Sequence, residues 1–235
     1  MNTYRKTSII VGALFIIGTV AGISSGVVTG PILSESDYLT AVAANESSMV
    51  LGALLILVMG FPLAMIPVMM YPIFRKYNQP LALGAVVFRG VLEAVTYMII
   101  TTCWLLLTTA GQAFVNAGAA DAATFQAMGT FIKQAVYWTE HILALVFTIG
   151  ALMLYWLFFK TKLIPSWLAL WGFFGAILYF AAPIFNLFDP LHPALSLGVK
   201  WGNLMAPLAI QEMVFALWMI IKGFNTDALA SQSTK

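Results

Sequence analysis

Charged side chains are scarce in this chain: they make up 9% of its 235 residues, while hydrophobic residues make up 61%. A soluble domain carries about a quarter charged residues, because water must wet its surface. A surface built from this composition would be mostly apolar, so we expect the surrounding solvent to be lipid. Nucleic acid is excluded as a partner, because the formal net charge is only +2 and no basic run occurs.

Residues that bind metals or act as nucleophiles are also few. The single cysteine, Cys103, excludes an internal disulfide and any cysteine-based metal cluster, and its apolar neighbours indicate a small buried side chain. No HExxH or HxxxH spacing joins the two histidines, and no GxSxG, phosphate-binding loop or dinucleotide fingerprint occurs. The sequence therefore assigns no catalytic residue and no metal ligand, and it leaves any cofactor unknown.

Six long apolar runs are what the chain does contain. A membrane-spanning helix needs about 20 mostly apolar residues. Helices are favoured over barrel strands, because the runs are continuously apolar and show no alternation. We expect an all-α polytopic membrane protein, a six-helix bundle in residues 1–224, with spans at about 7–30, 48–74, 81–109, 131–159, 163–186 and 199–222.

The segments between and after the runs are too short for a soluble domain. The longest are 31–47 and 110–130, and the second has the composition of a short helix at the membrane interface. The tail 225–235 is polar and is predicted to be a disordered cytoplasmic segment. A cleaved signal peptide is an alternative interpretation of the first run, but this run is longer than usual and its removal would leave five spans.

Basic residues predict the orientation. Eight of them fall on one side of a six-span topology: Arg5, Lys6, Arg75, Lys76, Lys160, Lys162, Lys222 and Lys235. The other side has Lys133 and Lys200 among basic residues, and it holds most of the acidic ones. Basic residues concentrate in cytoplasmic loops, so both termini are predicted to be cytoplasmic.

A glycine repeat in the first run predicts close helix packing. Gly18, Gly22, Gly26 and Gly30 recur every four residues and share one helix face. Without side chains on that face, a second helix can approach closely. The repeat does not tell whether the partner helix belongs to this chain or to a second copy in a homo-oligomer.

Five ionisable side chains fall inside predicted spans: Arg89, Glu93, Glu140, His141 and Glu212. A charge at the bilayer centre costs about 2.5–3.5 kcal/mol on insertion scales. Such residues therefore face the bundle interior, where they pair with one another or bind a ligand or a proton. We predict that these five form the ligand- or proton-binding group.

Arg89, Glu93 and Glu212 are expected to form its centre. Arg89 and Glu93 are four residues apart, so they lie on one helix face. Arg89 and Glu212 lie about 12 Å and about 15 Å from the basic side at helical rise, which is a similar depth. We therefore expect Arg89 to bridge both carboxylates. Burial disfavours ionisation, so one glutamate is expected to carry a proton or to be neutralised by a cation.

A second polar set is predicted to line a vestibule that leads from the less basic side toward Arg89. Its members are Tyr97, Gln134, Asn186, Asp189 and His192. Zinc is a weaker hypothesis here, because carboxylates and histidines are suitable ligands but lack a recognisable spacing.

Three segments carry a resemblance to a known family: YRKTSIIVGALFIIGTVAGI at the start, FRGVLEAV in the third span and the closing MVFALWMIIKGF. Together they resemble a bacterial family of six-span membrane proteins catalogued as a domain of unknown function (4386-type), over residues 4–224. The resemblance implies a six-helix protein of the bacterial inner membrane that contains the Arg89/Glu93 pair. It implies no activity.

The sequence favours an integral membrane protein whose polar cavity binds or transports a small ligand, ion or lipid, with proton coupling as an option. An intramembrane metal-assisted enzyme that uses Glu140 and His141 is one alternative. A structural or accessory membrane subunit, in which Arg89 and its glutamates only lock helices together, is the other. The bilayer is the expected partner in each case.

Overall fold

The protein is an all-α bundle, as predicted. The computed structural model describes residues 3–117, 119–188 and 197–233. Six of the helices in this part of the chain are long and apolar enough to cross a membrane. The elements are α1 (Thr3–Ser34), α2 (Tyr38–Ala44), α3 (Glu46–Phe74), α4 (Gln79–Ala85), the π-helical turn η1 (Val86–Leu92), α5 (Glu93–Asn116), α6 (Ala119–Thr161), α7 (Ser166–Leu187), α8 (Leu197–Ile221) and α9 (Thr226–Ser233).

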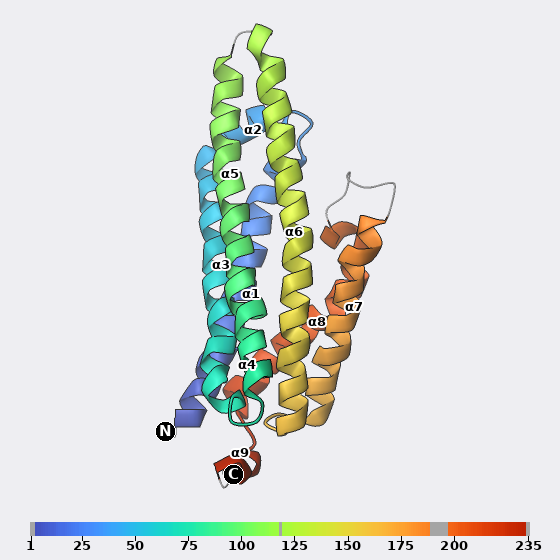
Figure 1. The fold of residues 1–235 in the computed structure, drawn as a ribbon. Helices are drawn as coiled ribbons and strands as arrows, with labels where there is room; N and C mark the ends of the chain where they lie inside the picture. The colour runs from blue at the N-terminus through green and yellow to red at the C-terminus, as the bar shows by residue number, and fades with distance from the viewer. Residues whose placement is uncertain (1–2, 118, 189–196, 234–235) are drawn as a thin grey trace.

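The long helices form a closed ring in chain order. Helix α1 packs against α3, α3 against α5, α5 against α6, α6 against α7 and α7 against α8, and α8 closes the ring by packing against α1. Both termini lie at the same end of this bundle, as an even number of spans requires (Figure 1). Seven of the eight basic residues predicted to share one side lie near the start of α1 or at helix ends on this side, here called the basic end, and Lys235 lies outside the described residues.

The six spans differ greatly in length. Helix α6 has 43 residues, whereas α7 has 22. The paired ends of α5 and α6 therefore extend well beyond α7 and α8 (Figure 1). The short helix α2 packs beside this extension, with Leu39 and Val42 buried against the upper part of α5. The segment 110–130, expected to contain a short interfacial helix, instead continues α5 and α6.

A π-helical turn interrupts the third span at Val86–Leu92. In a π-helix each backbone N–H pairs with the carbonyl five residues earlier, so the turn is wider than an α-turn. Such turns are rare and often coincide with functional sites. Arg89 lies in the middle of this one. The sequence analysis did not predict it, since apolar residues surround it on both sides.

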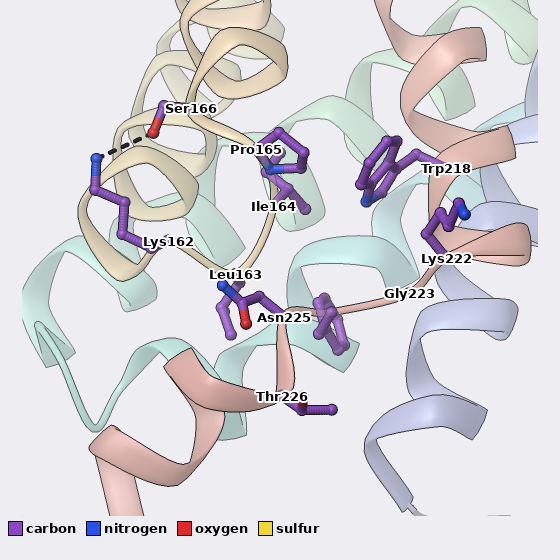
Figure 2. Close-up of a pocket in the computed structure, with 11 residues that line it drawn as sticks. Lys162, Leu163, Ile164, Pro165, Ser166, Trp218, Lys222, Gly223, Asn225 and Thr226 are labelled. Atoms are coloured by element: carbon purple, nitrogen blue, oxygen red, sulfur yellow. Dashed lines mark hydrogen bonds between the residues drawn. The ribbon is translucent and has the colours of Figure 1, made fainter.

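At the basic end, two connections lie side by side. One joins α6 to α7 through Lys162–Pro165, and the other joins α8 to α9 (Figure 2). They are linked by a hydrogen bond of 2.9 Å in which the backbone N–H of Asn225 donates to the carbonyl of Leu163. Helix α7 begins at Ser166, later than the predicted 163, because Pro165 disfavours helical geometry in the residue before it.

The C-terminal tail and the glycine repeat of α1 both differ in part from what the sequence predicted. The tail predicted to be disordered contains α9, which begins after Asn225, whose side-chain oxygen accepts a hydrogen bond of 3.1 Å from the backbone of Asp227. In the glycine repeat, side chains at Gly18 and Gly22 would collide with Leu63 and Met59 of α3, whereas nothing lies within 4 Å at Gly26 or Gly30. Gly18 and Gly22, the half of the repeat nearer the basic end, therefore pack against α3 of the same chain.

Candidate functional site

Arg89 lies at the centre of the helix ring, fully buried. Its guanidinium carbon is 4.4 Å from the ring centre of Phe147 on α6 and 5.4 Å from that of Phe15 on α1. Gly150 of α6 makes this position possible, because an added Cβ there would lie 2.6 Å from the Cβ of Arg89. The π-turn and a missing side chain on the facing helix thus bring the arginine to the axis of the bundle.

The predicted contact between Arg89 and Glu212 is formed. Nη2 of Arg89 donates to Oε1 of Glu212 at 2.6 Å, and the Glu212 side chain is only 13% exposed. The two residues were expected at a similar depth in the membrane. In the structure they are in direct contact, although they are 123 positions apart in the chain. This ion pair joins the third and sixth spans across the ring.

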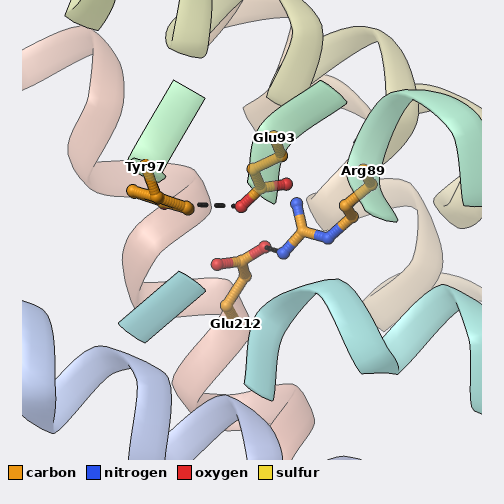
Figure 3. A network of polar contacts seen from close by, with 4 residues as sticks. All are labelled: Arg89, Glu93, Tyr97 and Glu212. Carbon is orange, nitrogen blue, oxygen red and sulfur yellow. Dashed lines mark hydrogen bonds and ion pairs between the residues drawn. The ribbon is translucent and has the colours of Figure 1, made fainter. Parts of the chain in front are cut away.

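The predicted contact between Arg89 and Glu93 is not formed. Glu93 is 1% exposed and makes no ion pair with Arg89. The expectation assumed α-helical spacing, under which residues four apart face each other, but the π-turn changes that spacing between these two positions. Glu93 instead accepts a long hydrogen bond of 3.4 Å from the hydroxyl of Tyr97. Figure 3 shows Arg89 directed toward both carboxylates, with Tyr97 beyond Glu93.

Several buried polar atoms around this ion pair lack partners among the described residues. Arg89 leaves Nε and Nη1 unused, and Glu93 leaves Oε2 unused. Tyr155 and Gln211, which were not expected at this site, also lie here, and the hydroxyl of Tyr155 interacts with the side chains of Gln211 and Glu212. Native proteins pair nearly all buried polar groups, and a buried charge is the most costly to leave incomplete. The cluster is therefore only half satisfied.

Tyrosines extend the cluster. Tyr155 lies close enough to Glu212 and Arg89 to interact with them electrostatically. Tyr179 of α7 interacts in the same way with Glu93, Glu212 and Glu140, and its ring centre is 5.1 Å from that of Phe147. Gln211 could have been found from the sequence, since it is a polar residue within a span. The tyrosines carried no comparable signal, because aromatic residues are ordinary in apolar runs.

A second polar network joins α6, α7 and α8 around Asn186. Its amide nitrogen donates to the hydroxyl of Tyr137 at 2.6 Å and lies 2.7 Å from Nε2 of His141. Nε1 of Trp201 donates to its amide oxygen at 3.0 Å. Nδ1 of His141 lies 2.8 Å from the backbone carbonyl of Tyr137. Asn186 is fully buried, and all of its side-chain polar atoms have partners.

These contacts fix the protonation of His141. The indole of Trp201 only donates, so it must face the oxygen of Asn186, and the amide nitrogen must then face His141. Nε2 of His141 is therefore an acceptor, and Nδ1 carries the proton that is donated to the Tyr137 carbonyl. Both ring nitrogens of His141 are engaged in this arrangement.

The three described residues of the predicted vestibule, Tyr97, Gln134 and Asn186, do not lie together. Tyr97 belongs to the Arg89 cluster and Asn186 to the His141 network, while Gln134 lines a separate hollow formed by α6 alone. Glu140 interacts electrostatically with Tyr179, whereas the adjacent His141 lies beside Asn186. Asp189 and His192 lie outside the described residues. In the part of the chain that is described, no three His, Cys, Asp or Glu side chains gather to hold a metal ion.

Comparison with known families gives one match. A family model described as "Domain of unknown function (DUF4386)" matches residues 10–223. No curated protein and no solved structure matches the chain. The match covers most of α1, all of the other five long helices and both polar networks.

Proposed function

The chain belongs to the family described as Domain of unknown function (DUF4386), and we propose that this polytopic membrane protein binds a proton at the Arg89 cluster and carries it through the membrane. The observation that supports this most is the half-satisfied ion pair. Arg89 uses one of its three guanidinium nitrogens, although a second carboxylate lies four residues along the chain. A purely structural lock is expected to pair both carboxylates, since unpaired buried polar groups oppose folding.

Charge balance favours a cationic guest. Arg89 contributes one positive charge, and Glu93 and Glu212 contribute two negative charges when both are ionised. The group then carries an excess negative charge in a buried setting, which is costly unless a cation or a proton neutralises it. Arg89 and Glu93 are closed off from solvent. A proton can bind to a carboxylate without a cavity, so it suits these enclosed residues better than a larger cation does.

The proposed mechanism is an exchange of partners. With Arg89 paired to Glu212, the proton resides on Glu93. When Arg89 turns its unused nitrogens to Glu93, the proton moves to Glu212, which is the more exposed of the two carboxylates. Two alternative pairings of one arginine form a two-state element of the kind that transport requires. A co-transported solute would act by favouring one of the two pairings.

Glu140 is the next ionisable group along this route. It interacts electrostatically with Tyr179, which also interacts with Glu93 and Glu212. We propose that Glu140 passes protons between the Arg89 cluster and the end of the bundle opposite the basic end. By the distribution of basic residues, the basic end faces the cytoplasm, and the family resemblance suggests a bacterial inner membrane.

Two measurements test the proposal. Infrared difference spectroscopy of the purified protein should reveal a protonated carboxyl group, and Glu93→Gln should remove its band. In proteoliposomes with an imposed potential and an internal pH dye, the parent should carry protons, and Glu93→Gln and Glu212→Gln should abolish the flux. Glu46→Gln is the matched control, because this carboxylate is exposed and contacts only Gln112 among the described residues. Equal flux in parent and both cluster variants would refute the proposal.

A further inference from the structure

A pocket of about 520 Å³ lies at the basic end, between the α6–α7 connection and the α8–α9 turn. Its lining includes Lys162, Ser166, Trp218, Lys222 and Asn225 (Figure 2). This pocket is separate from the Arg89 cluster and shares no residue with it. The proposal for this pocket therefore does not rest on the proposed proton transfer.

The backbone at both sides of the pocket is held in place. Gly223 has a φ of +75°, which suits glycine, and its N–H donates to the carbonyl of Trp218 at 3.0 Å to end α8. Lys162 ends α6 with a φ of +56°, a conformation that costs energy for a residue with a side chain. Glycine is the usual residue there, so a lysine at this position is retained at some cost in stability.

The charge of the pocket is positive. Lys162 and Lys222 are exposed residues of its wall, and among the described residues no carboxylate lines it. Arg5 lies directly beside Gly223, where its guanidinium group donates to the last carbonyls of α8, including that of Met219 at 3.2 Å. The nearest acid along the chain is Asp227, one residue beyond the lining. An anionic group would therefore meet an excess of positive charge.

Hydrogen-bond donors are also available at the wall. Nε1 of Trp218 is buried and has no partner among the described residues. Ser166 begins α7, and Pro165 before it provides no side-chain cap for the first N–H groups of the helix. Lys162 donates to the hydroxyl of Ser166 at 3.0 Å, which directs that amine toward the start of α7. Unused N–H groups at a helix start favour anions, and here they accompany two lysines and an indole.

Tryptophans place the pocket at the membrane surface. The rings of Trp167 and Trp218 are 6.3 Å apart in an edge-to-face contact, and Trp167 is 53% exposed. Trp171 continues this row on α7, 6.4 Å from Trp167. Tryptophans concentrate at the level of lipid headgroups. The pocket thus lies where a phosphate group of the bilayer would be found.

We propose that this pocket binds a phosphate group, held by Lys162, Lys222 and the indole N–H of Trp218. The group can belong to an anionic phospholipid or to a soluble phosphate compound, since both present the same oxygens. The adjacent tryptophans favour the lipid, whose acyl chains would lie along α7 and α8. An ammonium group binds phosphate as a compact point charge, and a long lysine side chain can turn to reach it.

The test measures lipid retention by the full chain in detergent. Native mass spectrometry should show phosphatidylglycerol bound to the parent more tightly than phosphatidylcholine. The double variant Lys162→Gln/Lys222→Gln should weaken phosphatidylglycerol binding by about 25-fold, taking about fivefold per lysine. Trp218→Phe keeps a ring but removes the donor, and should weaken binding by about tenfold. Lys76→Gln, a basic residue at the same end but outside the pocket, should change it less than about twofold.

A competition arm separates the two sources of phosphate. Inorganic phosphate that displaces phosphatidylglycerol from the parent, and binds the double variant less well, would identify a soluble phosphate compound as the ligand. Retention of the lipid under excess inorganic phosphate would identify the phospholipid. If the parent binds neither probe better than the double variant does, no phosphate site exists there. The substituted lysines are exposed, so loss of folding is not expected to obscure the result.

Discussion

The two polar networks in this bundle differ in completeness. Around Asn186, every side-chain polar atom of the asparagine and both ring nitrogens of His141 have partners. Around Arg89, a fully buried guanidinium group makes one ion pair and leaves two nitrogens unused. A complete network has nothing further to bind and holds helices in register. An incomplete one retains unused binding capacity, which is the physical reason that transport is proposed for the Arg89 cluster and a stabilising role for the Asn186 network.

Removing the charge of Arg89 should have the largest effect on stability. Arg89→Met leaves Glu212 buried without its partner, and we expect a loss of about 3–5 kcal/mol in the free energy of unfolding. Chemical unfolding in detergent micelles would measure it. The double variant Arg89→Met/Glu212→Met should recover most of the loss, because no unpaired charge then remains. A loss in the double variant as large as in the single one would contradict this account of the ion pair.

Asn186→Leu should have the next largest effect. It removes the hydrogen bonds that the Asn186 side chain makes with His141, Tyr137 and Trp201, at a total cost on the order of 3 kcal/mol. The same unfolding measurement applies. Proton flux per folded molecule should stay at the parent level, since this network lies outside the proposed route. A variant that folds fully but has lost its flux would remove the distinction between the two networks.

Gly150→Ala tests how tightly Arg89 is enclosed. The added methyl group would lie 2.6 Å from both the Cβ and the backbone nitrogen of Arg89, so the helices must separate. We expect a loss of about 1–3 kcal/mol, as overpacking usually causes. Gly26→Ala is the matched control, because nothing lies within 4 Å there and alanine favours a helix by about 1 kcal/mol. Similar losses in both variants would show that the contact is unimportant.

Glu93→Gln should have the smallest effect on stability and one of the largest on flux. Its carboxylate makes only a hydrogen bond of 3.4 Å with Tyr97, so we expect a change below about 1 kcal/mol. Thermal melting and the proteoliposome assay, run on the same preparation, would separate the two quantities. A destabilisation comparable to that of Arg89→Met would mean that Glu93 serves the fold and would weaken the transport proposal.

The sequence predicted the fold well, because crossing a bilayer requires long apolar runs that few other structures need. The sequence also predicted the contact between Arg89 and Glu212. A charge inside a span is costly unless it is paired, and the helical rise placed both residues at a similar depth. The sequence did not predict the π-turn, because the i→i+5 pairing leaves no periodic signal in a uniformly apolar segment. The described residues show an ion pair of Arg89 with Glu212 and none with Glu93, although Arg89 and Glu93 interact electrostatically.

The predicted vestibule stays a prediction, since Asp189 and His192 lie outside the described residues, but its described members lie apart. Spans that are apolar on all sides have no polar stripe to distinguish the lipid-facing side from the interior. The sequence therefore gave no means of telling that Gln134 and Asn186 face different surroundings. Polar neighbours such as Tyr155 and Tyr179 were missed because a tyrosine in an apolar run is not costly enough to require an explanation.

The unequal lengths of α6 and α7 make the orientation measurable with one reagent. Both helices meet at Lys162–Pro165, but at helical rise α6 is about 64 Å long and α7 about 33 Å. A hydrocarbon layer of about 30 Å covers α7 and leaves the far half of α6 in water on one side. Phe131, which is 78% exposed, lies on that half. After Cys103→Ser, a cysteine introduced by Phe131→Cys would react with an impermeant maleimide from a single compartment and so reveal the sidedness of the chain.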